Sequence, residues 1–241
     1  MHLARWPKGR NPLVVWLAIL STGVALCVLA LFLLNALLPP PRVLPSFREV
    51  RVAYLPSDGV LLDRHGDPLQ EVRVDFRSRR LPWVPLAGIS PSLVAAVLRS
   101  EDKRYYRHSG VDGIALLSAT AGNLLRGKSR GASTITMQLA TLLDEGRKVH
   151  GTQERILAKI RQARMALLLE LSWKKEEVLE AYLNRVTFRG ELQGIAAASR
   201  GMFDKEPGGL DAAESVVLAS LIRSPNASPV DVARRAGLLC S

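Results

Sequence analysis

Residues 101–112 read EDKRYYRHSGVD and form the first of three polar clusters in the chain. The second cluster, at residues 131–140, reads GASTITMQLA, and the third, at residues 175–184, reads KEEVLEAYLN. Each places acidic, hydroxyl or amide side chains at fixed intervals among apolar ones, which is how sequence motifs with a chemical role are built. One such cluster can arise by chance, whereas three in this order indicate a composite functional site.

The three clusters resemble signature boxes of the peptidoglycan glycosyltransferases of family 51. Those boxes are written ED-x-x-F/Y-x-x-H-x-G-x-D, G-x-STIT-x-Q and K-x-x-I/V-L-x-x-Y-L-N. The resemblance covers roughly residues 43–229. Three segments also resemble the penicillin-binding protein 1C-like subgroup of class A proteins, namely residues 131–134, 161–162 and 188–195.

This resemblance implies a mainly α, lysozyme-like fold with a larger head lobe and a smaller jaw lobe beside a groove that opens toward a membrane. It implies polymerisation of lipid II into glycan strands, with inversion at the sugar carbon and release of undecaprenyl pyrophosphate. The expected partners are lipid II, the growing strand, the membrane and other cell-wall synthesis proteins, and nucleic acid is not expected. The resemblance also implies a divalent cation, Mg²⁺ or Mn²⁺, with ligands that the sequence does not identify.

The implied reaction needs a base for an attacking sugar hydroxyl and cations for a departing pyrophosphate. By resemblance, Glu101 is the catalytic base. Five residues are expected to support the site, with Asp102 orienting the local network and Asp112 fixing the loop: Asp102, His108, Asp112, Lys175 and Tyr182. Seven are expected to bind substrate: Ser133, Thr134, Gln138, Arg155, Lys159, Arg161 and Asn184.

Two positions depart from the family pattern. Gln162 stands where the family has a second glutamate, and glutamine can form hydrogen bonds but cannot ionise. Thr141 stands where relatives tend to carry Lys or Arg. The spacing of Arg155, Lys159 and Gln162 predicts that they share one helix face, which is either solvated or binds pyrophosphate.

The N-terminal region has the pattern of a membrane anchor. No charged residue occurs between Asn11 and Pro41, and the apolar run is long enough for a bilayer, which needs about 20 residues. Because basic residues precede the run, the sequence predicts a cytoplasmic tail (1–12) and a transmembrane signal anchor (13–38) that crosses the cytoplasmic membrane once. The rest of the chain is then expected on the external side of that membrane. Residues 1–41 hold three of the 33 basic residues and none of the 22 acidic ones, so the remainder has a net charge of +8.

The remainder divides into a predicted stalk (39–80) and a predicted glycosyltransferase domain (81–241). Two short apolar runs around the turn at 65–68 predict a β-hairpin in the stalk. Helices are predicted after Ser90-Pro91, from Thr152 onward and over 211–222, with Pro225 and Pro229 ending the last one. Apolar stripes are expected at Ile156, Leu157, Ile160, Leu167, Leu168 and Leu171, and at Val178, Leu179, Tyr182 and Leu183.

Two other functions remain open from the sequence: a non-catalytic membrane-anchored cell-wall scaffold and a lytic transglycosylase. The Ser172–Lys175 and Ser224–Asn226 segments match S-x-x-K and S-x-N, but no K-T-G follows, so no penicillin-binding transpeptidase domain is predicted. Whether the chain is complete or the front part of a bifunctional protein is left open by its sequence.

Overall fold

The computed structural model describes residues 14, 16, 21–23, 25, 44–116, 118, 133–144 and 152–240. The chain divides into two compact units, Met1–Arg42 and Val43–Ser241. The predicted anchor, 13–38, lies almost wholly outside the described residues and stays a prediction. Of the helices in the described parts of the chain, none combines the length and the apolar character needed to cross a membrane.

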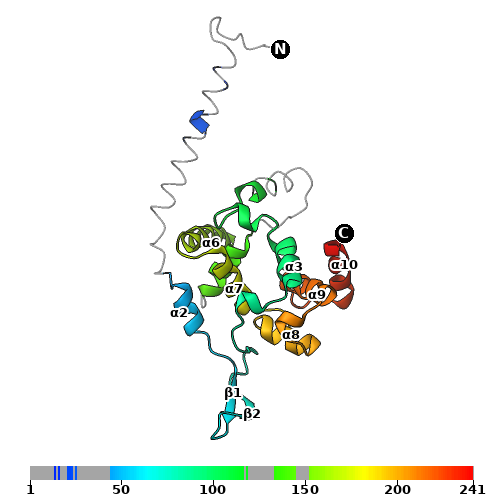
Figure 1. Ribbon diagram of the computed structural model, residues 1–241. Helices are drawn as coiled ribbons and strands as arrows, with labels where there is room; N and C mark the ends of the chain where they lie inside the picture. The colour runs from blue at the N-terminus through cyan, green and yellow to red at the C-terminus, as the bar shows by residue number, and fades with distance from the viewer. Residues whose placement is uncertain are drawn as a thin grey trace, which may run out of the picture. The chain divides into compact units, whose positions relative to one another are not determined.

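The second unit is mainly helical, which confirms the predicted fold class at that level (Figure 1). Its α-helices are α2 (Phe47–Val52), α3 (Pro91–Glu101), α5 (Ile135–Leu143), α6 (Thr152–Ser172), α7 (Lys175–Arg185), α8 (Ile195–Phe203), α9 (Ala212–Ile222) and α10 (Pro229–Cys240). Short 3₁₀ turns occur at η1 (Leu86–Gly88), η2 (Tyr105–Arg107) and η3 (Pro207–Gly209). The predicted hairpin is present as antiparallel strands β1 (Asp58–Leu62) and β2 (Pro68–Arg73).

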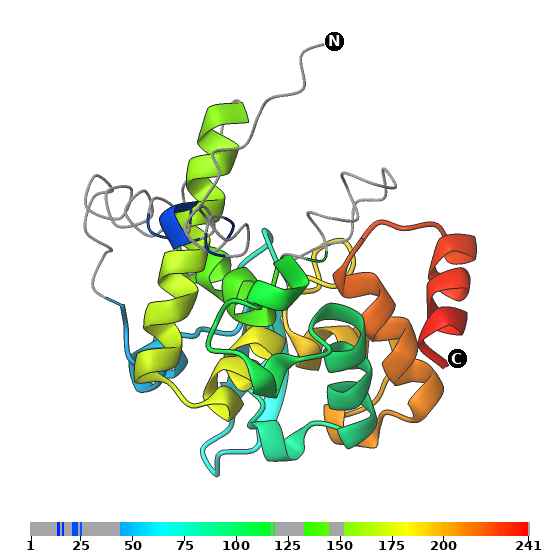
Figure 2. The ribbon, with the colours of Figure 1, turned by 90° about the horizontal axis from the view of Figure 1, so that it is seen from above.

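The core of this unit is centred on α7. Its predicted apolar stripe, Val178, Leu179, Tyr182 and Leu183, is fully buried. Helix α5 packs against both α6 and α7, and α3 packs against α9 (Figure 2). Burial of each large apolar side chain contributes about 1.5–3 kcal/mol, so this stripe fixes α7 as the support for the elements around it.

The stripe predicted for α6 is wrong in part. Leu167 is 47% exposed and Leu171 is 82% exposed, whereas Ala166 and Leu169 are completely buried. Residues 167–169 are three consecutive leucines, and successive helical side chains point about 100° apart. Composition alone therefore could not identify the leucine that faces the core.

The helix predicted over 211–222 is confirmed as α9, which ends before Pro225, but it is not the last helix, because Pro229 begins α10. Proline suits the first helical turn, where its missing N–H would have no intrahelical partner. The preceding Ser228 accepts a hydrogen bond from the Asp231 amide at 3.2 Å, which caps this turn. Helix α10 then packs against α9.

The structure shows no division at residue 80, where the sequence predicted the end of a stalk. The Val50 side chain of α2 is buried in the core, and the Trp173 indole donates to the Pro45 carbonyl at 3.2 Å. Arg73 of β2 forms a bidentate pair with Glu191, with both N···O distances 2.8 Å. The described residues from 44 onward therefore pack as part of the helical unit.

The loop after α3 is held by a close backbone contact at Gly110. This residue has a φ of +84°, and a β-carbon added there would lie 2.5 Å from the Ala166 carbonyl oxygen of α6. On the other side, the Gly110 carbonyl accepts a hydrogen bond from the Thr134 hydroxyl. The loop that carries residues 102–112 is therefore pinned between α6 and the start of α5.

We expect Gly110→Ala to lower the free energy of unfolding by about 3 kcal/mol or more, because it adds left-handed strain to a backbone clash. Urea unfolding followed by circular dichroism measures the change. Gly113→Ala is the matched control, since nothing lies within 4 Å of its added β-carbon and its backbone is helical. That variant should stay within about 1 kcal/mol of the parent. Equal stability of both variants would contradict the close contact.

Candidate active site

Glu101 is the last residue of α3, and it lines a cavity of about 490 Å³. The Pro91–Glu101 helix was predicted to deliver this residue, and Pro91 does open it. The cavity is built from several separate segments of the chain. Its lining includes Asp102, Lys103, Arg104, Asp112, Ile114, Ser133, Thr134 and Arg223.

Both carboxylate oxygens of Glu101 accept hydrogen bonds. The Ser100 hydroxyl donates to Oε1 at 3.1 Å, and the Gln138 amide nitrogen donates to Oε2 at 3.0 Å. The Gln138 amide oxygen in turn accepts from the Tyr182 hydroxyl at 2.8 Å. Gln138, expected to bind substrate, is therefore brought directly to the candidate base. The two donors fix the orientation of the Glu101 carboxylate at the cavity wall.

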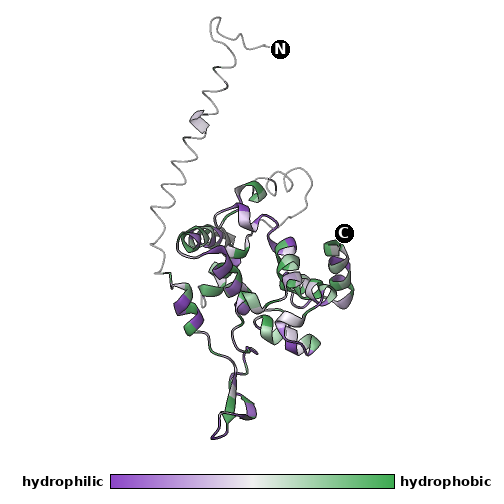
Figure 3. Ribbon diagram, in the orientation of Figure 1, coloured by the Kyte–Doolittle hydropathy of each residue, from purple (hydrophilic) through white to green (hydrophobic). Residues whose placement is uncertain are grey.

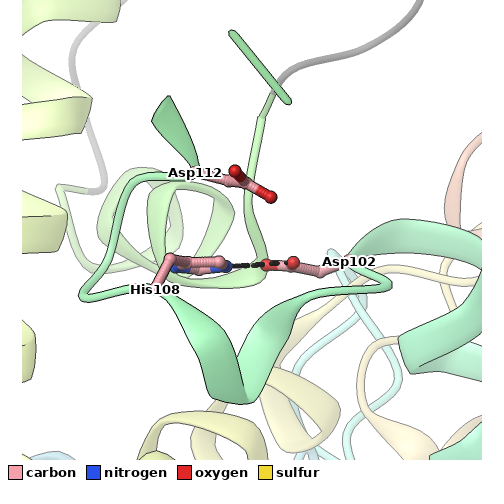
Figure 4. Close-up of side chains that lie close together, drawn as sticks. All are labelled: Asp102, His108 and Asp112. Atoms are coloured by element: carbon pink, nitrogen blue, oxygen red, sulfur yellow. Dashed lines mark hydrogen bonds and ion pairs between the residues drawn. The ribbon is translucent and has the colours of Figure 1, made fainter. Parts of the chain in front are cut away.

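Asp102 lies at the centre of a buried network next to Glu101 (Figure 4). Both of its carboxylate oxygens lie 3.0 Å from Nε2 of His108, and Oδ2 also accepts from the Ile135 amide at 3.1 Å. Asp112 accepts from the Ala115 amide at 2.9 Å. These contacts place Asp102, His108 and Asp112 together, in positions that brace the loop rather than reach a substrate.

Asp102, His108 and Asp112 also present ligand atoms within 4.8 Å of one another, the one such group found among the described residues. The ligand atoms that face one another are already engaged, since His108 Nε2 contacts Asp102 and Arg104 lies 3.3 Å from Asp112, whereas His108 Nδ1 is buried without a hydrogen-bond partner. A cation here would have to displace both contacts. This donor set therefore fits a resident divalent ion poorly.

Thr134 lies at the wall of the cavity and is almost completely buried. It is 2% exposed, its hydroxyl donates to the Gly110 carbonyl, and it accepts from the Met137 amide at 3.1 Å as the N-cap of α5. Thr134 thus has a structural role at the start of α5, and its expected substrate contact stays a prediction. Ser133 does line the cavity, and Lys159 Nζ donates to its hydroxyl at 2.6 Å.

Gln162 and Thr141, the two departures from the family pattern, line one small cavity between α5 and α6. Arg161 and Asp144 also line it, and its volume is about 60 Å³. Arg161 is thus separated from the Glu101 cavity, to which it was expected to contribute. The predicted common face of Arg155, Lys159 and Gln162 cannot be completed, because the Arg155 side chain lies outside the described part of the structure.

Asn184 is 1% exposed and has no access to a substrate. Its amide oxygen accepts from the Val84 amide at 2.8 Å, and its amide nitrogen donates to the carbonyls of Val84 and Glu180 at 2.8 and 2.9 Å. It therefore ties the segment before η1 to α7. The expected substrate contact of Asn184 is corrected to this structural role.

Lys175 and Tyr182 lie on α7 behind the loop of residues 102–112. Lys175 Nζ lies 2.7 Å from Glu170 Oε1 and 4.3 Å from the centre of the Tyr105 ring. Burial raises the pKa of Tyr182 well above its ordinary value, and the charges of Glu101 and Asp102 act in the same direction. The Tyr182 hydroxyl is therefore a permanent hydrogen-bond donor.

Arg223 is a cavity residue that the sequence reasoning did not identify. It directly follows α9, is exposed, and forms no ion pair with a carboxylate in the described residues. It lies in none of the three clusters, so no local signal marked it. Only the packing of α9 against α3 brings it to the same cavity as Glu101.

Comparison with known proteins gives a consistent result. Residues 65–238 match the model of the Transglycosylase family. The chain is 39% identical to penicillin-binding protein 1C of Escherichia coli over 168 residues, which are 69% of this chain and 21% of that protein. It is 33% identical to a biosynthetic peptidoglycan transglycosylase of Shewanella oneidensis over 219 residues, covering 90% and 83% of the two chains. The corresponding protein of Rhodospirillum centenum is 36% identical over 163 residues, covering 66% and 68%.

We expect Asn184→Ala to lower the free energy of unfolding by about 2–4 kcal/mol, because it removes three hydrogen bonds and leaves partly buried backbone groups of Val84 unpaired. Urea titration measures this loss. Unchanged unfolding combined with a selective rise in the KM for substrate would return Asn184 to the substrate-binding residues.

Proposed function

Because this chain belongs to the transglycosylase family, we propose that it is a peptidoglycan glycosyltransferase that joins lipid II to a growing glycan strand. The observation that carries the proposal is the carboxylate of Glu101, held at the wall of a cavity by an amide and a hydroxyl donor. The chain spans about a fifth of penicillin-binding protein 1C, with 21% of that protein covered. Lipid II as substrate and the growing glycan strand as partner are therefore proposed for this chain.

In the proposed reaction, Glu101 takes the proton from the 4-hydroxyl of the acceptor sugar. The freed oxygen forms a bond to the anomeric carbon of the donor, and the bond from that carbon to the pyrophosphate oxygen breaks. Attack from the face opposite the leaving group inverts this carbon. Undecaprenyl pyrophosphate leaves with the bonding electron pair, and positioned general-base catalysis of this kind is typically worth about 10²–10⁴-fold in rate.

The departing pyrophosphate needs positive charge, which the cavity supplies from two elements. Lys159 of α6 reaches the cavity wall through its hydrogen bond to Ser133. Arg223, just beyond α9, lines the same cavity without a carboxylate partner in the described residues. We assign both cations to the phosphates of the substrate, since preorganised charges stabilise a developing anion most where water is excluded.

A divalent cation was expected from the resemblance, but the residues present do not fit a protein-held ion. Asp102 and His108 contact each other through Nε2, and Asp112 contacts Arg104. At the other candidate position, Gln162 replaces a carboxylate and Arg161 contributes a positive charge. The proposed reaction therefore uses no metal ion held by the protein. A cation that accompanies pyrophosphate is treated as part of the substrate.

The two alternatives have less support. A degenerate scaffold has no need of a base that is held by two hydrogen bonds, and here both Ser100 and Gln138 donate to Glu101. Cleavage of glycan strands is less consistent with relatives that are named as biosynthetic transglycosylases. We further propose that the chain is anchored in the cytoplasmic membrane by residues 13–38, with its catalytic unit on the external side, where other cell-wall synthesis proteins act.

Replacement of Glu101 by glutamine should reduce lipid II polymerisation by about 10²–10⁴-fold, because the amide cannot accept the proton. The assay is gel analysis of glycan product formed by the full chain in detergent or vesicles, with circular dichroism to verify folding. Glu71→Gln on β2 is the control and should keep the parental rate. A Glu101→Gln variant that polymerises at the parental rate would refute the base assignment.

The two proposed phosphate-binding cations give a second prediction. Lys159→Gln and Arg223→Gln should each raise the KM for lipid II several-fold, whereas the melting temperature should change little because exposed cations contribute little to folding. Arg234→Gln is the matched control, since Arg234 is exposed and pairs with Asp231 at 2.9 Å on α10. A KM equal to that of the control variant would remove either cation from the phosphate site.

A further inference from the structure

Tyr182 is completely buried on α7, yet its hydroxyl is directed at the hydrogen-bond network of the candidate base. Its hydroxyl donates to the Gln138 amide oxygen at 2.8 Å, and the Gln138 amide nitrogen donates to Glu101 Oε2 at 3.0 Å. The three side chains come from α7, α5 and α3. The core helix is thereby connected to the reacting carboxylate through a single amide group.

We propose that Tyr182 is a positioning residue, which fixes the orientation of the Gln138 amide so that its nitrogen, and not its oxygen, faces the Glu101 carboxylate. The inference rests on the proposed function only in taking Glu101 as the base. Tyr182 itself does not contact substrate in this proposal, because it is completely buried.

The two ends of the Gln138 side-chain amide differ, because the oxygen only accepts hydrogen bonds and the nitrogen only donates them. The buried Tyr182 hydroxyl stays protonated, and a buried donor without an acceptor costs about 1–3 kcal/mol. The amide oxygen therefore faces Tyr182. This leaves the nitrogen facing Glu101, where a donor stabilises a carboxylate more than a carboxylic acid.

Removal of the tyrosine hydroxyl takes away this preference. With phenylalanine at position 182, the Gln138 amide can turn by 180° without losing a bond to residue 182. Its oxygen would then face Glu101 and accept a hydrogen bond from the protonated carboxyl. The protonated state of the base would be stabilised, so that a higher pH would be required for activity.

The other groups around Glu101 give no equivalent explanation for such a change. Charged and titratable side chains reach the region from the loop after α3, from α6 and from the end of α9, and all lie on elements other than α7: Asp102, Lys103, Arg104, His108, Asp112, Lys159 and Arg223. The Tyr182→Phe substitution adds no charge and leaves these groups in place. A shifted titration of Glu101 would therefore report on the amide.

The experiment compares the pH dependence of kcat/KM for lipid II polymerisation in the full-length parent and in Tyr182→Phe. We expect the acid limb to move to higher pH by about one unit, the size of one hydrogen bond to a charged group. The rate should fall about tenfold below the limb and recover at high pH. A purely structural role would lower the rate equally at every pH, and such a uniform loss would overturn the proposal.

Tyr54→Phe is the matched control. Burial raises the pKa of Tyr54 to about 12, and its hydroxyl donates to the Leu81 carbonyl at 3.1 Å, outside the Glu101 network. Its pH profile should superimpose on that of the parent. If Tyr182→Phe also superimposes on the parent, Tyr182 has no influence on the base and the inference fails.

A second measurement separates this inference from the proposed function. Carbon-13 NMR of glutamate carboxyl groups follows protonation of Glu101 without turnover, with Glu101→Gln identifying its signal. An upward shift of its titration in Tyr182→Phe supports the inference even if the parent does not polymerise lipid II, a result that would reject the proposed function alone. Should Tyr182→Phe not fold, Gln138→Met removes the same donor, and an unshifted Glu101 signal in that variant would overturn the inference.

Discussion

The arrangement of the site depends on the burial of one carboxylate, Asp102. A buried charge is costly unless several groups compensate it, and Asp102 has the His108 ring and the Ile135 amide within hydrogen-bond distance. These partners belong to the loop after α3 and to the first turn of α5. The need to give the Asp102 carboxylate its hydrogen-bond partners therefore determines how the end of α3, the loop and α5 meet. Glu101, its immediate neighbour, takes its position from the same requirement.

The two departures from the family pattern are linked by their position. Thr141 and Gln162 line the same small cavity, so a missing cation and a missing carboxylate leave a polar but uncharged pair of side chains. The cavity retains Arg161 and Asp144, and so it remains polar. The two departures from the family pattern thus affect the α5–α6 interface, whereas the Glu101 network is built from other residues.

The sequence predicted the parts of the structure that follow from local patterns. The hairpin, the helix ending at Glu101 and the buried stripe of α7 were found because periodicity and turn residues specify them. The structural roles of Thr134 and Asn184 were not predicted, since their polar groups form hydrogen bonds with backbone atoms distant in sequence. Arg223 was missed for the same reason, because helix packing and not a motif brings it to the cavity. Tertiary contacts of this kind are not encoded in any one segment.

The β-hairpin has a consequence for the handling of the protein. Val60, Leu61, Leu62 and Leu69 are each about half exposed or more, at 49%, 57%, 52% and 65%, and Figure 3 shows apolar residues along this ribbon. The two strands form a sheet of their own, so each has an outer edge with backbone groups that a further strand can pair with. Concentrated solutions therefore favour edge-to-edge association of ribbons from different molecules. Solubility and catalysis thus depend on different parts of the same unit. A charged substitution in the hairpin would improve solubility without affecting catalysis.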